Sequence, residues 1–152
     1  MPTPTSSLDR DVIARVERYG WYVIKVLGGD AEPPFAYTVG LSQSFGHPEA
    51  IVVGLSGDVA HAILNLLGSR IEEGEVFGEN QQVEDLIDGY PAALRAVSAP
   101  NKVSYLTYAS WYNDDRDYPA FQLVYPDEAG QWPGDPSTSA LFRSRQPLLG
   151  GV

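Results

Sequence analysis

The sequence of 152 residues contains no cysteine. Disulfide bonds, thiolate metal centres and cysteine nucleophiles are therefore excluded, and this composition fits a reducing compartment. No apolar run approaches the roughly 20 residues that a membrane-spanning helix requires. The N-terminal stretch MPTPTSSLDRD lacks the basic and apolar segments of a secretory signal. We therefore expect a cytoplasmic protein without a membrane partner.

Basic residues are scarce, since 10 lysines and arginines stand against 20 acidic residues and give a formal net charge of −10. Such a charge repels phosphate backbones, and no basic stripe offsets it. We therefore expect no nucleic-acid partner. The nucleotide-binding motifs GxGxxG and GxxxxGK(S/T) are absent as well. Because the acidity is spread along the chain, it favours a role in solubility over a role as an acidic docking surface.

The composition is that of one folded domain, with 43% hydrophobic and 11% aromatic residues. A chain of this length buries a core of its own without staples. Residues 1–7 are rich in proline, threonine and serine, so we predict a disordered N-terminal tail there. We expect a single globular domain over residues 8–152.

In the first half of the chain, capping signals and hydrophobic spacing predict two helices. The first follows Ser6 or Ser7 and ends at Gly20, and the second follows Ser56 and runs from about Gly57 to Glu73. Three strands are predicted from alternating or β-branched residues, namely Trp21–Leu27, Phe35–Leu41 and Ala50–Leu55.

The second half has weaker signals. Short helices are predicted at Gln82–Ile87 and Pro91–Val97, the longest strand at Asn101–Tyr112, and its hairpin partner at Ala120–Tyr125. The fold class is therefore α+β. We expect a curved, mostly antiparallel sheet that resembles a split barrel, with two to three helices.

The stretch from Phe35 to Leu55, FAYTVGLSQSFGHPEAIVVGL, is the centre of this prediction. In its first strand, alternation places Ala36, Thr38 and Gly40 on one face, which is small enough for a helix, another chain or a ligand to lie against it. We predict a ligand pocket beside Phe35–Leu41. Tyr37, Thr38 and Gly40 are its candidate ligand-binding residues.

A Gly-His-Pro-Glu turn follows this strand and supplies His47 and Glu49 as candidate catalytic residues. A neutral imidazole can act as a general base or a ligand donor, and a nearby carboxylate can orient it. The alternative is structural, with His47 bonded to a backbone carbonyl and Pro48 stiffening the entry to the next strand. Gln122 is a further candidate for ligand binding through its side-chain amide.

His61 and Asn65 lie one turn apart on the second predicted helix and are also candidate ligand-binding residues. The alternative for this face is solvent exposure. We expect no metal site, because the two histidines show no HxH, HExxH or HxxxH spacing. Ser42 and Ser44 lack the GxSxG context of a hydrolase nucleophile. The acidic stretch of residues 113–117 is predicted to be a solvated turn.

The segments GWYVIKV, FAYTVGL and GHPE, followed by an apolar strand, resemble the bacterial domain of unknown function 4262 family. The later segment FQLVYPDEAGQWPGD is similar to the closing pattern of that family. Together these motifs extend from about Gly20 to Asp135. The family's usual tryptophan after the second proline is replaced here by Gly134. Since the family has no assigned activity, the resemblance implies no particular chemistry.

A second resemblance concerns the order of elements. A helix, three strands and a crossing helix are similar to the opening of the flavin-reductase and pyridoxamine-phosphate-oxidase split barrels. This resemblance implies a homodimer that binds flavin or deazaflavin at its interface.

Two functional hypotheses follow. In the first, the protein is a small-molecule-binding protein or enzyme, in its most specific form a flavin-linked oxidoreductase-like domain. In the second, it is a non-catalytic interaction module, such as an immunity or regulatory protein. A deep pocket at His47 would favour the first hypothesis, and a flat acidic or apolar patch would favour the second.

Overall fold

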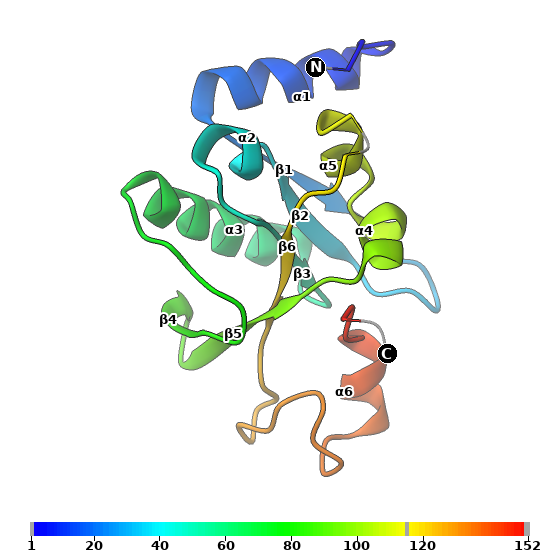
Figure 1. Ribbon diagram of the computed structural model, residues 1–152. Helices are drawn as coiled ribbons and strands as arrows, with labels where there is room; N and C mark the ends of the chain where they lie inside the picture. Colours follow the sequence, from blue (N-terminus) through cyan, green and yellow to red (C-terminus); the bar gives the residue numbers. More distant parts are fainter. Residues whose placement is uncertain (1, 115, 151–152) are drawn as a thin grey trace.

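The computed structural model describes residues 2–114 and 116–150 (Figure 1). Met1, Asp115, Gly151 and Val152 lie outside the described residues. Three predictions therefore lie partly outside the described residues. They are the disordered tail at residue 1, the solvated turn at residue 115 and the end of the globular domain at residues 151 and 152.

Six strands form one sheet in the order β1-β2-β3-β6-β5-β4. Their bounds are Tyr22–Val26 for β1, Phe35–Val39 for β2, Glu49–Val53 for β3, Gln82–Ile87 for β4, Tyr90–Ala96 for β5 and Ala120–Val124 for β6. All neighbouring strands are antiparallel except β3 and β6, which run parallel at the centre of the sheet. The sheet is thus mixed and mostly antiparallel.

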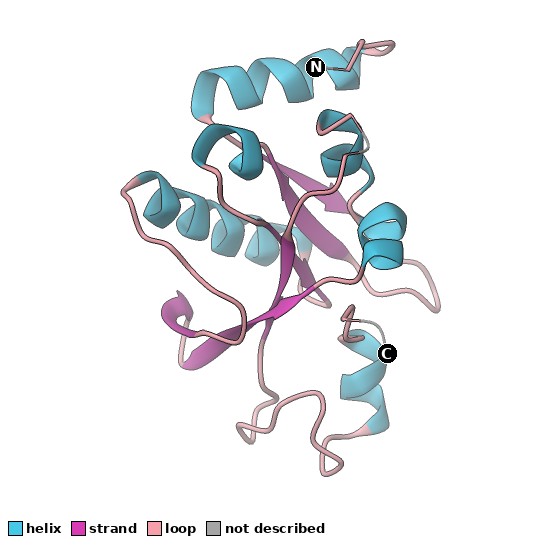
Figure 2. Cartoon of the chain, viewed as in Figure 1, coloured by secondary structure: helices cyan, strands magenta, loops and turns pink. Residues whose placement is uncertain are grey.

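Helices cover both faces of this sheet (Figure 2). Their bounds are Ser7–Tyr19 for α1, Leu41–Phe45 for α2, Gly57–Glu72 for α3, Ala99–Tyr105 for α4, Thr107–Tyr112 for α5 and Ala140–Arg145 for α6. One core lies between α3 and the sheet. The other lies between the sheet and the helices α1, α4 and α5. No helix in the described part of the chain has the length and apolar character needed to cross a bilayer.

The two helices and three strands predicted for the first half of the chain are confirmed, but the short helix α2 was not predicted. The Ser6 hydroxyl accepts a hydrogen bond from the amide of Asp9 at the start of α1, and Gly20 ends that helix in the left-handed region. The Ser56 hydroxyl caps α3 by accepting from the amide of Val59. Strands β1, β2 and β3 lie within one or two residues of their predicted bounds.

The small face of β2 is covered by a helix, one of the three alternatives that the sequence left open. Ala36 is fully buried and packs in the core beneath α3, with Ala60 and Leu64 from that helix. The absence of larger side chains on this face of β2 lets the helix approach closely. The side chains of Tyr37 and Val39 point into the other core, under α1 and α5.

The prediction of a split-barrel-like sheet is wrong. Strands β1 and β4 remain at opposite edges of the sheet, which is neither closed nor strongly curled. A barrel would require these two edges to pair. The fold has six helices in the described residues rather than two or three, although only α1, α3 and α4 reach seven residues.

The helices predicted at Gln82–Ile87 and Pro91–Val97 are strands β4 and β5 instead. In β4 an irregularity between Val83 and Ile87, with Asp85 at a φ of 66°, lets Val83 and Leu86 both become buried. Their spacing of three residues imitates a helix. A β-bulge breaks the period of two on which strand prediction depends.

The strand predicted at Asn101–Tyr112 is wrong as well, because this segment forms α4 and α5. The Ser98 hydroxyl caps α4 and Pro100 lies in its first turn. The fully or largely buried residues Leu106, Ala109 and Tyr112 are three apart, which is helical spacing. The predicted partner strand β6 is present, but it pairs with β3 and β5.

Candidate functional site

Glu49, the first residue of β3, is the centre of a buried polar cluster. Its carboxylate accepts hydrogen bonds from the Thr38 hydroxyl at 2.8 Å and from the amides of Gly40, Leu41 and Ser42 at 3.1–3.2 Å. These three amides begin α2, so Glu49 closes the N-terminus of that short helix. The Thr38 oxygen also accepts from the amide of Ala50 at 2.9 Å. The cluster therefore joins β2, α2 and β3.

The protonation of Glu49 is set by two opposing effects. Burial, which is complete for this side chain, raises its pKa to about 7. The hydrogen bonds from Thr38 and from the three amides lower the pKa and so work against this shift. A carboxyl group with this pKa can exchange a proton near neutral pH, which is a property that catalytic carboxylates share.

His47 lies in the turn before β3 and is 5% exposed. Its Nδ1 lies 2.9 Å from the carbonyl oxygen of Pro48, and its Nε2 lies 3.1 Å from the amide nitrogen of Phe77. Because the amide must donate, Nε2 accepts, so the proton of the neutral ring is on Nδ1. Both nitrogens are therefore occupied. A role as general base requires that the Phe77 hydrogen bond be broken first.

Gln122 lies in β6 and is fully buried. Its side-chain amide donates to the carbonyl of Pro147 and accepts from the amide of Leu149, both at 2.8 Å. These two bonds attach the C-terminal segment to the sheet. Gln146 makes an equivalent pair of bonds with the backbone of Tyr125.

His61 and Asn65 lie on α3 in contact with each other, as their spacing indicates. The Asn65 side-chain nitrogen lies 3.2 Å from Nε2 of His61, and its oxygen accepts from the indole of Trp21 at 3.0 Å. Both residues are partly exposed. Asn65 therefore positions Trp21 against α3.

The structure brings some of the predicted site residues together and separates others. Thr38, Gly40 and Glu49 form one cluster. Tyr37 points to the opposite face of β2, where its hydroxyl accepts from the amide of Tyr108 at 3.0 Å. Gln122, and the pair of His61 and Asn65, each have separate partners. In the described residues no three metal-ligating side chains lie close enough to hold an ion.

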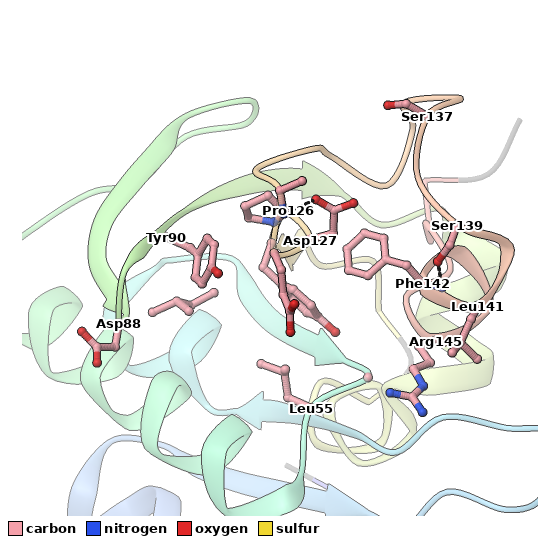
Figure 3. Close-up of a pocket in the computed structure, with 15 residues that line it drawn as sticks. Leu55, Asp88, Tyr90, Pro126, Asp127, Ser137, Ser139, Leu141, Phe142 and Arg145 are labelled. Carbon is pink, nitrogen blue, oxygen red and sulfur yellow. Dashed lines mark hydrogen bonds between the residues drawn. The ribbon is translucent and has the colours of Figure 1, made fainter.

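A surface hollow with a volume of about 850 Å³ lies elsewhere, beyond the carboxyl ends of β3 and β6 (Figure 3). It is bounded by the hairpin of β4 and β5, by the loop after β6 and by α6. Its lining includes Leu55, Ile87, Tyr90, Tyr125, Pro126, Leu141 and Phe142. Gly54 follows Glu49 by five residues, so roughly 16 Å of strand separates this hollow from the Glu49 cluster.

Three contacts hold the residues at the base of the hollow in place. The Tyr125 hydroxyl donates to the carbonyl of Val53 at 2.8 Å, and burial raises its pKa to about 12 although Arg145 acts in the opposite direction. The ring of Phe142 meets that of Tyr125 edge to face, with centroids 6.1 Å apart. Gly54 has a φ of +96°, and a Cβ there would lie 2.4 Å from the carbonyl oxygen of Arg145. Glycine thus allows α6 to end against β3.

The charged groups of the hollow are three carboxylates and one guanidinium. Asp88, Asp127 and Glu128 provide the carboxylates, and Arg145 provides the guanidinium. In the described residues Arg145 makes no ion pair or hydrogen bond through its side chain. Oδ1 of Asp127 accepts from the amides of Ala129 and Gln131, which stabilises the turn in the loop after β6.

None of the residues that line the hollow was among the candidate site residues of the sequence. They come from separate segments of the chain, and no short motif connects them. The aromatic residues between positions 105 and 125 are a partial signal, because aromatic side chains commonly line pockets for planar ligands. Of these, Tyr125 lines the hollow, whereas Tyr105, Tyr108 and Trp111 lie in α4 and α5 and pack against the core between those helices and the sheet.

The fold and the hollow define an open α+β domain with helices on both faces of a mixed sheet and a cleft at one end. The chain belongs to the family described as Domain of unknown function (DUF4262), whose profile matches residues 15–139. This range contains the Glu49 cluster and most of the hollow, and it ends just before α6. No curated protein and no solved structure matches the chain.

Proposed function

We propose that this protein binds a small organic molecule in the hollow beyond β3 and β6. The observation that carries this proposal is the hollow itself. Its volume of about 850 Å³ is within the range of roughly 300–1,000 Å³ that ligand sites occupy. Its walls are mainly apolar and aromatic, with a few charged groups. Open α/β sheets also bind ligands outside the carboxyl ends of parallel strands, and β3 and β6 are such a pair.

The Glu49 cluster supports this site from a distance. Glu49 joins the start of β3 to β2 and α2, and Gln122 in β6 anchors the segment that follows α6. Both strands that end at the hollow are therefore held by buried polar contacts. A more specific proposal is that His47 and Glu49 are catalytic residues. This role requires that a substrate reach the buried cluster in which they lie.

A flavin is the narrower form of the ligand proposal. Tyr90 and Phe142 lie on opposite sides of the hollow in Figure 3 and offer aromatic contacts to a planar ring system. Riboflavin and flavin mononucleotide form a useful pair of probes, because only the second carries a phosphate. The three carboxylates of the hollow disfavour a phosphate, so we expect riboflavin to bind at least as tightly. The resemblance to flavin-binding proteins also implies a homodimer, and light scattering of the same samples tests this assembly.

The binding proposal is tested by nuclear magnetic resonance with the labelled full-length chain and a library of soluble fragments that includes both flavins. We expect amide shifts that concentrate at Leu55, Ala129 and Phe142. A variant with Ala129→Trp fills the hollow from its rim and is expected to abolish these shifts.

Ala14→Trp is the matched control, because Ala14 is exposed on α1 and far from the hollow in sequence and fold. It is expected to leave every ligand-induced shift in place. If no fragment shifts the amides around the hollow, or if Ala129→Trp changes none of the shifts, the proposed function is wrong.

The interaction-module hypothesis has an observation of its own in a shallow groove along α3. The groove is lined by Val59, Leu66, Leu86 and Ile87 with Asp58 and Asp88 at its edge. Val59 and Leu66 are 50% and 42% exposed although both are apolar. Such a patch with acidic edges suits a basic partner protein. A Leu66→Lys variant that loses a partner but keeps fragment binding would favour this second function.

A further inference from the structure

We propose that the ligand of the hollow is zwitterionic, with a cationic group at one end, an anionic group at the other and an apolar or aromatic body between them. This inference rests on the proposed function, because it names the chemical class of the molecule that the hollow binds. It depends on how Asp88 and Arg145 are placed relative to the two aromatic side chains.

Asp88 and Arg145 lie at opposite ends of the hollow. In Figure 3 Asp88 is at the left, beside Tyr90, and Arg145 is at the right, beside Leu141. Two neighbouring hollows also indicate that Asp88 and Arg145 lie at opposite ends. Asp88 also lines the groove along α3, whereas Arg145 also lines a smaller hollow beside residues 29–34. Neither residue lines the second hollow of the other.

Both charged groups are available to a ligand. The Arg145 guanidinium lies on α6, is exposed, and is not within ion-pair distance of any carboxylate in the described residues. Asp88 is exposed at the tip of the β4–β5 hairpin, and its side chain likewise has no ion-pair partner there. Opposite charges that line the two ends of one hollow without neutralising each other form a complementary surface for a dipolar molecule.

The space between the two charged ends is suited to an apolar or aromatic body. Tyr90 and Phe142 present rings from the two sides, and Pro126 lies between them in Figure 3. The contact with Tyr125 holds the Phe142 ring in place.

The other charges of the hollow decide against a purely anionic ligand. Asp127 and Glu128 add two carboxylates to that of Asp88, so Arg145 is outnumbered. A ligand with only negative charge gains one attraction and meets three repulsions. A ligand with only positive charge leaves Arg145 without a partner. A zwitterion satisfies both ends.

The proposal is tested with four probes that share one aromatic body. These are para-(aminomethyl)phenylacetate, which is zwitterionic, para-methylbenzylamine, which is cationic, para-methylphenylacetate, which is anionic, and the neutral para-methylbenzyl alcohol. Their dissociation constants are measured by amide-shift titration of the full-length protein. We expect the zwitterion to bind about two- to fivefold more tightly than either singly charged probe, since one exposed ion pair contributes up to about that factor.

Two variants assign the charges to the two ends. Arg145→Gln is expected to weaken the zwitterion to the level of the cationic probe and to leave the cationic probe unchanged. Asp88→Asn is expected to weaken the zwitterion to the level of the anionic probe. Arg143→Gln on the same helix and Glu84→Gln on the same hairpin are the matched controls, because neither residue lines the hollow, and both are expected to have no effect.

The outcomes separate this inference from the proposed function. If the neutral or a singly charged probe binds in the hollow as tightly as the zwitterion, the ligand class is wrong and the binding function stands. The same holds if Arg145→Gln leaves zwitterion binding unchanged. If neither these probes nor the fragment library shifts the amides of the hollow, both the function and the ligand class are wrong.

Discussion

The hydroxyl of Thr38 lies 2.8 Å from Oε1 of Glu49, and both side chains are fully buried. The hydroxyl donates to the carboxylate while its oxygen accepts from the amide of Ala50. One threonine therefore satisfies a buried acceptor and a buried donor at once. Because unsatisfied buried polar groups are costly, this pair couples the ends of β2 and β3 more firmly than strand pairing alone.

A Thr38→Val substitution tests this coupling. Valine has the same shape but removes the hydroxyl, so the Glu49 carboxylate loses a donor and the Ala50 amide loses its acceptor. We expect the free energy of unfolding to fall by about 3 kcal/mol, because the buried Ala50 amide loses its acceptor and Glu49 loses one of its four donors. Urea unfolding at pH 7 measures the change. Thr38→Ser keeps both hydrogen bonds and is expected to cost only about 1 kcal/mol for the lost methyl group.

The pKa of Glu49 predicts how stability depends on pH. The folded chain keeps this proton until about pH 7, whereas the unfolded chain releases it near the ordinary value of 4.5. Between these values the folded state binds more protons, so the contribution of Glu49 to stability falls as pH rises. The difference of about 2.5 units corresponds to about 3 kcal/mol.

The control for this pH dependence is Glu49→Gln, which has no titratable group at this position. The difference in unfolding free energy between the wild type and this variant is measured from pH 4 to pH 8. We expect it to decrease from about pH 4.5 to pH 7 and to be level on either side. A difference that stays flat or increases with pH would mean that the four donors keep Glu49 ionised in the folded protein.

Gly68 on α3 is predicted to tolerate no larger side chain while Trp21 is present. A Cβ at this position would lie 2.4–2.8 Å from three atoms of the indole. Helix propensity alone would make Gly68→Ala stabilising by about 1 kcal/mol. We expect the opposite sign, a loss of about 2 kcal/mol, because the core is close-packed around the ring. Thermal unfolding distinguishes the two signs.

The Trp21→Ala background separates the steric cause from other effects of the alanine. With the indole removed, Gly68→Ala is expected to become neutral or stabilising. Ser69→Ala, the next position on the same helix, is expected to change stability little in either background. An equal loss on adding Gly68→Ala with and without Trp21 would contradict the steric explanation.

His47 is predicted to hold the segment after α3 against the turn before β3. His47→Ala removes the acceptor of the Phe77 amide and the donor to the Pro48 carbonyl. We expect hydrogen exchange at the Phe77 amide to become at least about tenfold faster, because about 1.4 kcal/mol of protection is lost there.

His61→Ala is the natural control for His47, because the chain has only these two histidines. It is expected to leave Phe77 exchange unchanged, since the His61 ring contacts Asn65 and the acceptor of the Phe77 amide is His47. Unchanged protection of Phe77 in His47→Ala would rule out the structural role. A variant that keeps its stability but loses ligand turnover would instead support the catalytic role considered from the sequence.

Local patterns predicted the first half of the fold because its elements carry their own signals. Ser6 and Ser56 cap the helices that follow them, and β2 alternates in the expected way. In the second half such signals conflict. Seven of the twelve residues 101–112 are apolar or aromatic, and they fit both periods, so only the burial of Leu106, Ala109 and Tyr112 decides between them.

The sequence identified the candidate residues by their chemical type, but it did not predict which groups surround them in the fold. Glu49 was identified as a titratable group, but its donors come from β2 and α2, and a sequence does not show how these elements meet. Gln122 was identified as a source of amide contacts, although its partners are Pro147 and Leu149 in the C-terminal segment. The hollow itself has no local signature, since its walls come from separate segments.

The sequence by itself determined the charge of the protein, the helix caps, the two faces of β2 and the polar residues that surround the Gly46–Glu49 turn. These features depend on composition or on residues a few positions apart. Only the tertiary structure decided that α3 covers the small face of β2 and that β6 inserts beside β3. The tertiary structure also brought Asp88 and Arg145 to the two ends of one hollow. Burial, strand register and cavities arise from contacts between residues far apart in the chain, and a local pattern does not encode those contacts.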